Sequence, residues 1–105
     1  MPGMLRLIEE NRSQIEKLCR RFGIRRLELF GSAASGTFNP EASDVDFFYE
    51  FDQNPTGLAD RFFGLQEVLQ KLLGKKVDLI SAKDATNPYF LQVANRNRVT
   101  LYAAA

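Results

Sequence analysis

The chain has 105 residues, of which 45% are apolar and 26% are charged, with a formal net charge of +1. This composition predicts one globular domain, residues 1–105, with a single core. The near-neutral charge argues against non-specific nucleic-acid binding as the main activity. There is no histidine and only one cysteine, Cys19, which excludes an intrachain disulfide, a Ser–His–Asp triad and His-ligated zinc. No apolar run approaches membrane-spanning length, so we expect a cytoplasmic protein without a membrane partner.

The first half of the chain predicts a helix, a strand and a loop. Apolar residues at helical spacing predict a helix over residues 4–22, which Gly23 terminates. Residues 25–30 predict a short strand that ends abruptly at Gly31-Ser32. The small, turn-forming residues 33–43 predict a helical turn followed by an exposed loop.

The second half predicts a sheet with helices packed on it. The aromatic and β-branched segment 44–51 predicts a strand. A helix is expected over residues 56–73, with Thr56 as its N-cap and Gly74 as its stop. Its expected buried stripe is Leu58, Phe62, Leu65, Leu69 and Leu72. Further predicted elements are strands at 76–81 and 99–102, the latter at a sheet edge, and a short helix at 86–97. The order of elements indicates an α/β (α+β) domain with one central sheet.

Two carboxylates lie close together at the start of the second strand. Residues i and i+2 of a strand share a face, so Asp44 and Asp46 lie side by side while Val45 points the other way. Such a pair repels unless a cation neutralises it. Carboxylate oxygens suit Mg²⁺, which is usually held by one or two carboxylates together with water and substrate phosphates. Taken alone, an Asp-x-Asp motif is more often a solvated strand edge than a metal site.

The dipeptide Gly31-Ser32 follows a strand and precedes a predicted helical turn. Gly31 allows close approach of the backbone to a ligand. The N–H groups of a helix N-terminus, together with the Ser32 hydroxyl, form a phosphate-binding corner. An ordinary strand-to-turn Gly-Ser is the alternative reading.

The two motifs together resemble a known family. A strand, Gly-Ser, eleven intervening residues and Asp-x-Asp on the next strand resemble the nucleotidyltransferases of DNA polymerase β type. The stretch over residues 29–47 is most similar to the minimal members, the MNT-domain proteins. That family has a small mixed central sheet flanked by helices and a third carboxylate on a later strand. Asp78, between Val77 and Leu79, is the matching candidate in this chain.

The resemblance implies two-metal nucleotidyl transfer from ATP or another nucleoside triphosphate. Asp44 and Asp46 would bridge two Mg²⁺ ions, and Asp78 would complete one metal's shell and assist deprotonation of an acceptor hydroxyl. Gly31 and Ser32 would hold the β- and γ-phosphates. Pyrophosphate would leave, and a nucleoside monophosphate would remain on the acceptor.

Resemblance also implies a partner. Minimal members are frequently encoded beside a HEPN-domain toxin, which they neutralise, in some cases by transferring AMP to it. Many members carry arginine where this chain has Ser35. The alternative function is therefore a catalytically weak or inactive antitoxin that acts by binding its partner. A homo-oligomer is left open, and direct nucleic-acid binding is not expected. Lys75 and Lys76 lie near Asp78 and fit either phosphate contacts or, more commonly, solvated charges after a helix.

Overall fold

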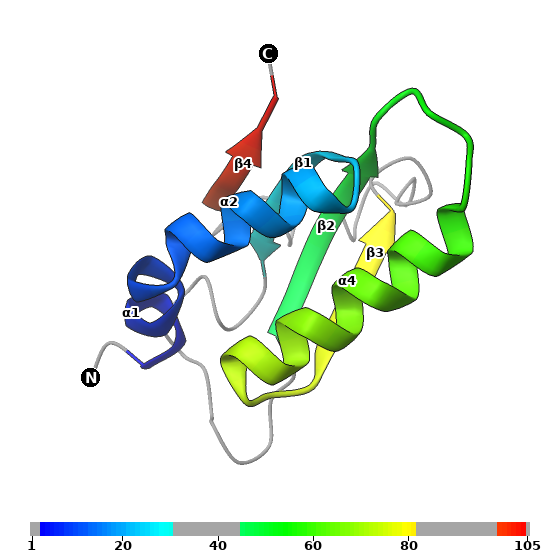
Figure 1. Cartoon of the computed structure of the whole chain (residues 1–105). Coiled ribbons are helices and arrows are strands. Elements are labelled where there is room, and N and C mark those ends of the chain that lie inside the picture. The colour runs from blue at the N-terminus through cyan, green and yellow to red at the C-terminus, as the bar shows by residue number, and fades with distance from the viewer. Residues whose placement is uncertain (1–2, 31–44, 82–98, 105) are drawn as a thin grey trace, which may run out of the picture.

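The computed structural model describes residues 3–30, 45–81 and 99–104 (Figure 1). Within these residues one four-stranded sheet has the order β3-β2-β1-β4. β1 is antiparallel to β2 and to β4, whereas β2 and β3 run parallel. The strands are β1 (Ile24–Phe30), β2 (Val45–Phe51), β3 (Val77–Ser81) and β4 (Val99–Ala103). The predicted mixed sheet is confirmed, with β4 at an edge. The loop predicted over 33–43 and the helix predicted over 86–97 lie outside the described residues.

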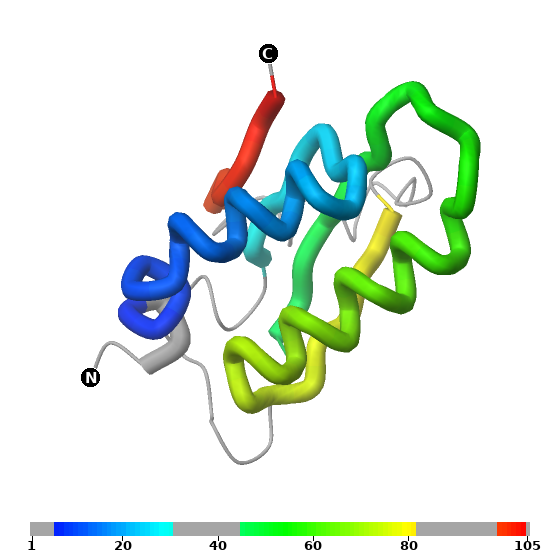
Figure 2. The backbone as a smooth tube through the Cα atoms, viewed as in Figure 1, coloured from blue at the N-terminus to red at the C-terminus, as the bar shows by residue number. Residues whose placement is uncertain are grey.

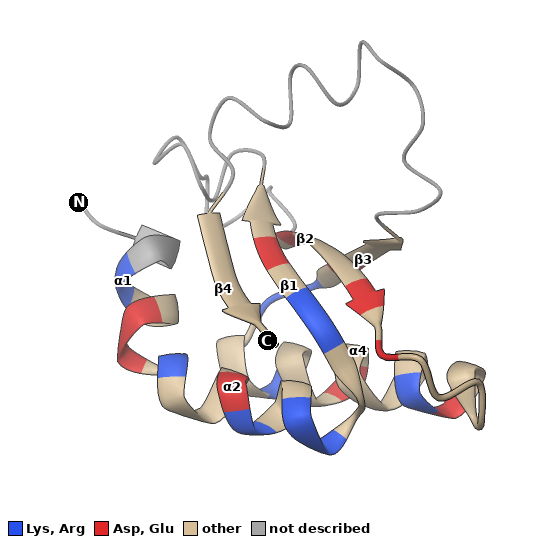
Figure 3. Ribbon diagram, turned by 90° about the horizontal axis from the view of Figure 1, so that it is seen from above, with Lys and Arg blue, Asp and Glu red and all other residues tan. Residues whose placement is uncertain are grey.

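The helices cover one face of this sheet. Figures 1 and 3 show α2 (Arg12–Arg21) and α4 (Leu58–Leu73) lying along the same face, with α1 (Gly3–Glu10) beyond the start of α2. α4 connects β2 to β3, as a parallel strand pair requires a crossover of this kind. Neither α2 nor α4 covers the opposite face of the sheet.

The single helix predicted over residues 4–22 is in fact two helices, which meet at Asn11 (Figure 2). Asn11 has φ −107° and ψ 12°, outside the helical region. Its side-chain amide donates a hydrogen bond of 2.9 Å to the Leu7 carbonyl, and such local side-chain bonds compete with the helical pattern. The bend leaves both Ile8 and Ile15 fully buried. Gly23, the predicted stop, follows α2 with φ 67°.

The amphipathic helix α4 buries a stripe at i, i+4 and i+8, namely Leu65, Leu69 and Leu73. The prediction of Leu58 as part of this stripe was wrong, because Leu58 is 41% exposed at the first turn. The expected N-cap Thr56 was also wrong. The cap is Gly57 in the left-handed conformation, with no side-chain capping bond. The predicted stop at Gly74 is confirmed by its φ of 68°.

Apolar side chains fill both faces of the sheet. The main core lies between the sheet and the helices and includes Leu27, Leu29 and Phe47. A second, smaller cluster consists of Phe30, Phe48 and the partly buried Ile80. The rings of Phe30 and Phe48 stack with centroids 4.1 Å apart. Because alternate residues of a strand point to opposite faces, this second cluster marks the sheet face away from α2 and α4.

Candidate active site

Asp46 and Asp78 lie side by side on neighbouring parallel strands. The register pairs Val45 with Val77 and Asp46 with Asp78. Both valines are fully buried in the main core, so the aspartates, which follow them, point to the other face. Both aspartates are half-buried. Adjacent strands are about 4.8 Å apart, so the two carboxylates can reach one ligand on that face.

The end of β1 lies next to this pair. Phe30, the last residue of β1, is the antiparallel partner of Asp46. β1 therefore ends beside Asp46, and β2 begins at Val45, so the segment 31–44 connects two neighbouring positions of the sheet. Gly31, Ser32 and Asp44 themselves lie outside the described residues. The structure brings together Asp46, Asp78 and the residues Phe30 and Val45, which flank the segment 31–44 in the sequence.

The donor set fits Mg²⁺ as far as it is described. Within residues 3–30, 45–81 and 99–104, no three His, Cys, Asp or Glu side chains converge on a common point. Asp46 and Asp78 form a two-carboxylate set, which is the number of protein ligands that Mg²⁺ commonly takes alongside water and phosphate. Asp44, the third predicted ligand, would add to this set.

Two glutamines of α4 fix the strand that carries Asp78. The Gln66 side-chain amide donates to the Val77 carbonyl at 2.9 Å, and the Gln70 side-chain carbonyl accepts from the Val77 N–H at 3.1 Å. β3 lies at the edge of the sheet that the described residues form, and these bonds satisfy the two Val77 backbone groups that face away from β2. This pair was not predicted from the sequence, although Gln66 and Gln70 have the i, i+4 spacing of one helix face.

Comparison with known proteins identifies the family. The family model of the nucleotidyltransferase domain matches residues 12–101. The chain belongs to this family. It is 42% identical over 69 residues to a Methanocaldococcus jannaschii protein provisionally named a protein adenylyltransferase, covering 66% of this chain and 68% of that protein. It is also 42% identical over 65 residues to the protein adenylyltransferase MntA of Thermococcus cleftensis, covering 62% of this chain and 63% of the relative.

Solved structures give the same result. A structure provisionally described as a minimal nucleotidyltransferase matches with a TM-score of 0.72 and 29% identity over 90% of this chain and 93% of that chain. A toxin–antitoxin complex with AMP-PNP matches with a TM-score of 0.66 and 25% identity over 90% of this chain and 74% of that chain. The protein is thus an MNT-type nucleotidyltransferase, and the predicted polymerase β-like fold is confirmed. None of the helices in the described part of this nucleotidyltransferase has the length and apolar character to span a membrane.

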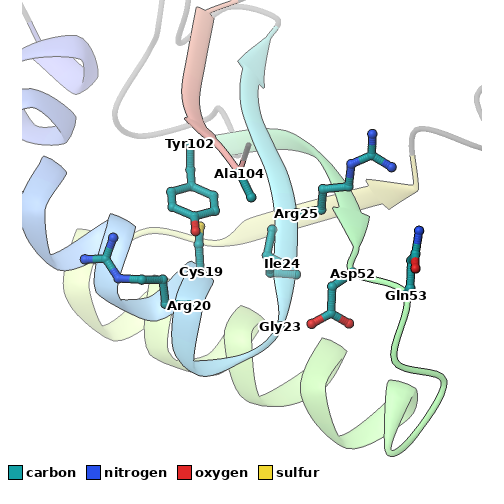
Figure 4. A pocket seen from close by; sticks show the side chains of 9 residues that line it. All are labelled: Cys19, Arg20, Gly23, Ile24, Arg25, Asp52, Gln53, Tyr102 and Ala104. Atoms are coloured by element: carbon teal, nitrogen blue, oxygen red, sulfur yellow. The ribbon is translucent and has the colours of Figure 1, made fainter.

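Two surface cavities lined by described residues of the nucleotidyltransferase domain, of about 510 and 480 Å³, lie away from Asp46 and Asp78. The larger one opens at the first residue of β1, between the end of α2 and the end of β4. Figure 4 shows Cys19 and Tyr102 on one side of it and Asp52 on the other. Since β1 runs from this cavity to Phe30, the cavity and the aspartate pair are at opposite ends of the sheet. The cavity is therefore separate from the candidate active site.

Cys19 is a structural residue of this domain. Burial, with a smaller contribution from the Glu16 carboxylate, raises the pKa of the Cys19 thiol from 9.0 to about 12. We expect the folded protein to resist alkylation at about pH 8 and the unfolded chain to react readily, as mass spectrometry would show.

The raised pKa of Cys19 also makes the free energy of unfolding depend on pH. The thiol loses its proton at a lower pH in the unfolded chain than in the folded protein, so the contribution of the protonated thiol to stability is complete below pH 9.0 and is lost as the pH rises towards about 12. A Cys19→Ala variant whose stability falls equally between about pH 8 and about pH 11 would contradict this.

Proposed function

We propose that this nucleotidyltransferase transfers AMP from ATP to a hydroxyl group of a HEPN-type partner protein in an Mg²⁺-dependent reaction. The observation that carries the proposal is the in-register pair Asp46 and Asp78 beside the end of β1. Support for a protein acceptor comes from relatives that are named protein adenylyltransferases. Support for the partner and nucleotide comes from the similar toxin–antitoxin structure with AMP-PNP.

In this proposal the aspartates bind the metal ion and the Gly-Ser motif binds the phosphates. Asp46 and Asp78 hold the metal together with Asp44, and Gly31 and Ser32 hold the β- and γ-phosphates. Mg²⁺, when bound, neutralises phosphate charge and polarises the α-phosphate.

The acceptor hydroxyl oxygen forms a bond to the α-phosphorus, and the bond from that phosphorus to the pyrophosphate oxygen breaks. Asp78 assists removal of the hydroxyl proton. The products are the adenylylated acceptor and pyrophosphate, and the cytoplasm is the compartment that supplies ATP and Mg²⁺.

Position-specific labelling of ATP tests this function. The protein is incubated with Mg²⁺, the product of the neighbouring gene, and ATP labelled at either the α- or the γ-phosphate. We expect the α-label on the partner and the γ-label in released pyrophosphate. Intact-mass analysis of the partner should show adenylyl groups.

Two results would contradict transfer. Label from the γ-position on the partner would indicate phosphoryl rather than nucleotidyl transfer. Full neutralisation of the partner with no label from either position would favour an antitoxin that acts by binding alone. Ser35, which stands where many family members carry arginine, agrees with such a function because it cannot supply a charge to the phosphates.

A further inference from the structure

We infer that Lys76 is the side-chain cation that binds the β- and γ-phosphates of the triphosphate, an inference that rests on the proposed function. Lys76 immediately precedes β3 and lies two residues before Asp78. Three observations support this role: the face on which Lys76 lies, the hydrogen bonds of the backbone around it, and the absence of lysine and arginine from the sequence of residues 31–44.

The strand alternation places Lys76 on the face of the aspartate pair. The Val45 N–H donates to the Lys76 carbonyl at 2.9 Å, so parallel pairing with β2 already includes Lys76. Val77 is fully buried in the main core on the helix side. In extended backbone the residues on either side of Val77, namely Lys76 and Asp78, point to the opposite face with their Cα atoms about 7 Å apart. Lys76 is exposed at this position.

The backbone around Lys76 is held on both sides. β2 binds the Lys76 carbonyl, and Gln70 and Gln66 of α4 bind the N–H and carbonyl of Val77 at 3.1 and 2.9 Å. The flexible four-carbon side chain thus starts from a fixed point. A cation whose backbone does not have to rearrange loses less entropy when it binds phosphate.

The segment that carries the Gly-Ser motif has no cationic side chain in its sequence. Residues 31–44 contain no lysine or arginine and include the acidic residues Glu41 and Asp44. Asp46 and Asp78 add two further negative charges on the same sheet face. Mg²⁺ offsets charge where the carboxylates hold it, but a polyanionic phosphate tail that extends beyond the metal needs a separate partner. Lysine is a compact point charge that commonly fills this role at phosphate sites.

Binding of nucleotides to matched variants tests the inference. Dissociation constants for Mg²⁺·ATP and for AMP are measured by calorimetry on the wild type, Lys76→Met, Lys76→Arg and the control Lys75→Met. Lys75→Met removes the same charge one residue away, in the turn that connects α4 to β3. Loss of a charge-assisted hydrogen bond predicts a Kd for Mg²⁺·ATP that is about 10- to 100-fold higher in Lys76→Met.

The expected pattern is specific to position, charge and phosphate. Lys76→Arg should recover most of the affinity, Lys75→Met should stay within about threefold of wild type, and AMP affinity should be unchanged in Lys76→Met. Unchanged ATP affinity in Lys76→Met overturns the inference alone, as does an equal loss of ATP and AMP affinity. A wild-type protein that binds no Mg²⁺·ATP overturns the proposed function together with it.

Discussion

Replacing Asp46 by asparagine should lower the rate of nucleotidyl transfer by at least about 10³-fold. Asp46 is the central member of the candidate site, since it pairs with Phe30 at the end of β1 on one side and with Asp78 on the other. Asparagine keeps the shape of the side chain and removes the charge, so the loss would report on metal and phosphate binding rather than on packing. The matched control is Asp60→Asn, an exposed aspartate in the first turn of α4, which should retain wild-type turnover.

The same variants separate loss of ligand binding from loss of folding. A ligand that binds only the folded state stabilises it by about 2.7 kcal/mol at a hundred times its Kd. Mg²⁺·ATP should therefore raise the melting temperature of wild type and Asp60→Asn, but not that of Asp46→Asn. If Asp46→Asn is stabilised as strongly as wild type, Asp46 does not bind the metal–nucleotide complex, and the site is elsewhere.

Structural features that depend on neighbouring residues in the sequence were predictable, whereas features that depend on contacts between distant residues were not. The strand over residues 45–51 was predictable because its aromatic and β-branched composition is a local signal, and so was the placement of Asp78 on the face opposite Val77 and Leu79. The register that places these two residues opposite each other is not local, because it depends on how α4 returns the chain to β2. The family resemblance supplied Asp78 as the candidate third carboxylate, but the register itself comes from the structure.

Helix ends and kinks were predicted less well than helix faces. The break at Asn11 depends on a side-chain bond to Leu7, which competes with an otherwise continuous apolar stripe. Thr56 resembled an N-cap, but its backbone N–H donates a hydrogen bond of 3.0 Å to the side-chain oxygen of Asn54. This bond forms an Asx-type turn at Asn54 in place of a helix N-cap at Thr56. The helix consequently begins later, after Gly57. In both places a short polar side chain decided between two local structures of similar propensity.

A long-range contact that no sequence pattern reveals surrounds Arg61. One guanidinium nitrogen of Arg61 donates to the carbonyls of Phe22 and Gly23 at 3.5 and 3.4 Å and lies 3.1 Å from the Asp52 carboxylate. The other terminal nitrogen donates to the Asn54 carbonyl. The Arg61 side chain is only 15% exposed. This single residue of α4 thereby joins the turn before β1 to the loop after β2.

Arg61→Ala should destabilise the fold by about 2–4 kcal/mol, measured by denaturant unfolding. The variant loses the charge-assisted bonds and the packing of the guanidinium over the Phe51 ring, whose centroid is 4.8 Å away. The control Arg6→Ala removes an ion pair with Glu10 whose side chains are 68% and 60% exposed, and it should cost less than about 0.5 kcal/mol. Equal effects in the two variants would show that the Arg61 contacts contribute no more than a surface pair.

Gly23→Ala should also destabilise the fold, since a Cβ atom on Gly23 would overlap the Arg61 guanidinium and Gly23 has a φ of +67°, which L side chains rarely adopt. Because this cluster lies at the opposite end of the sheet from Asp46, both variants should keep their affinity for Mg²⁺·ATP under conditions in which they remain folded.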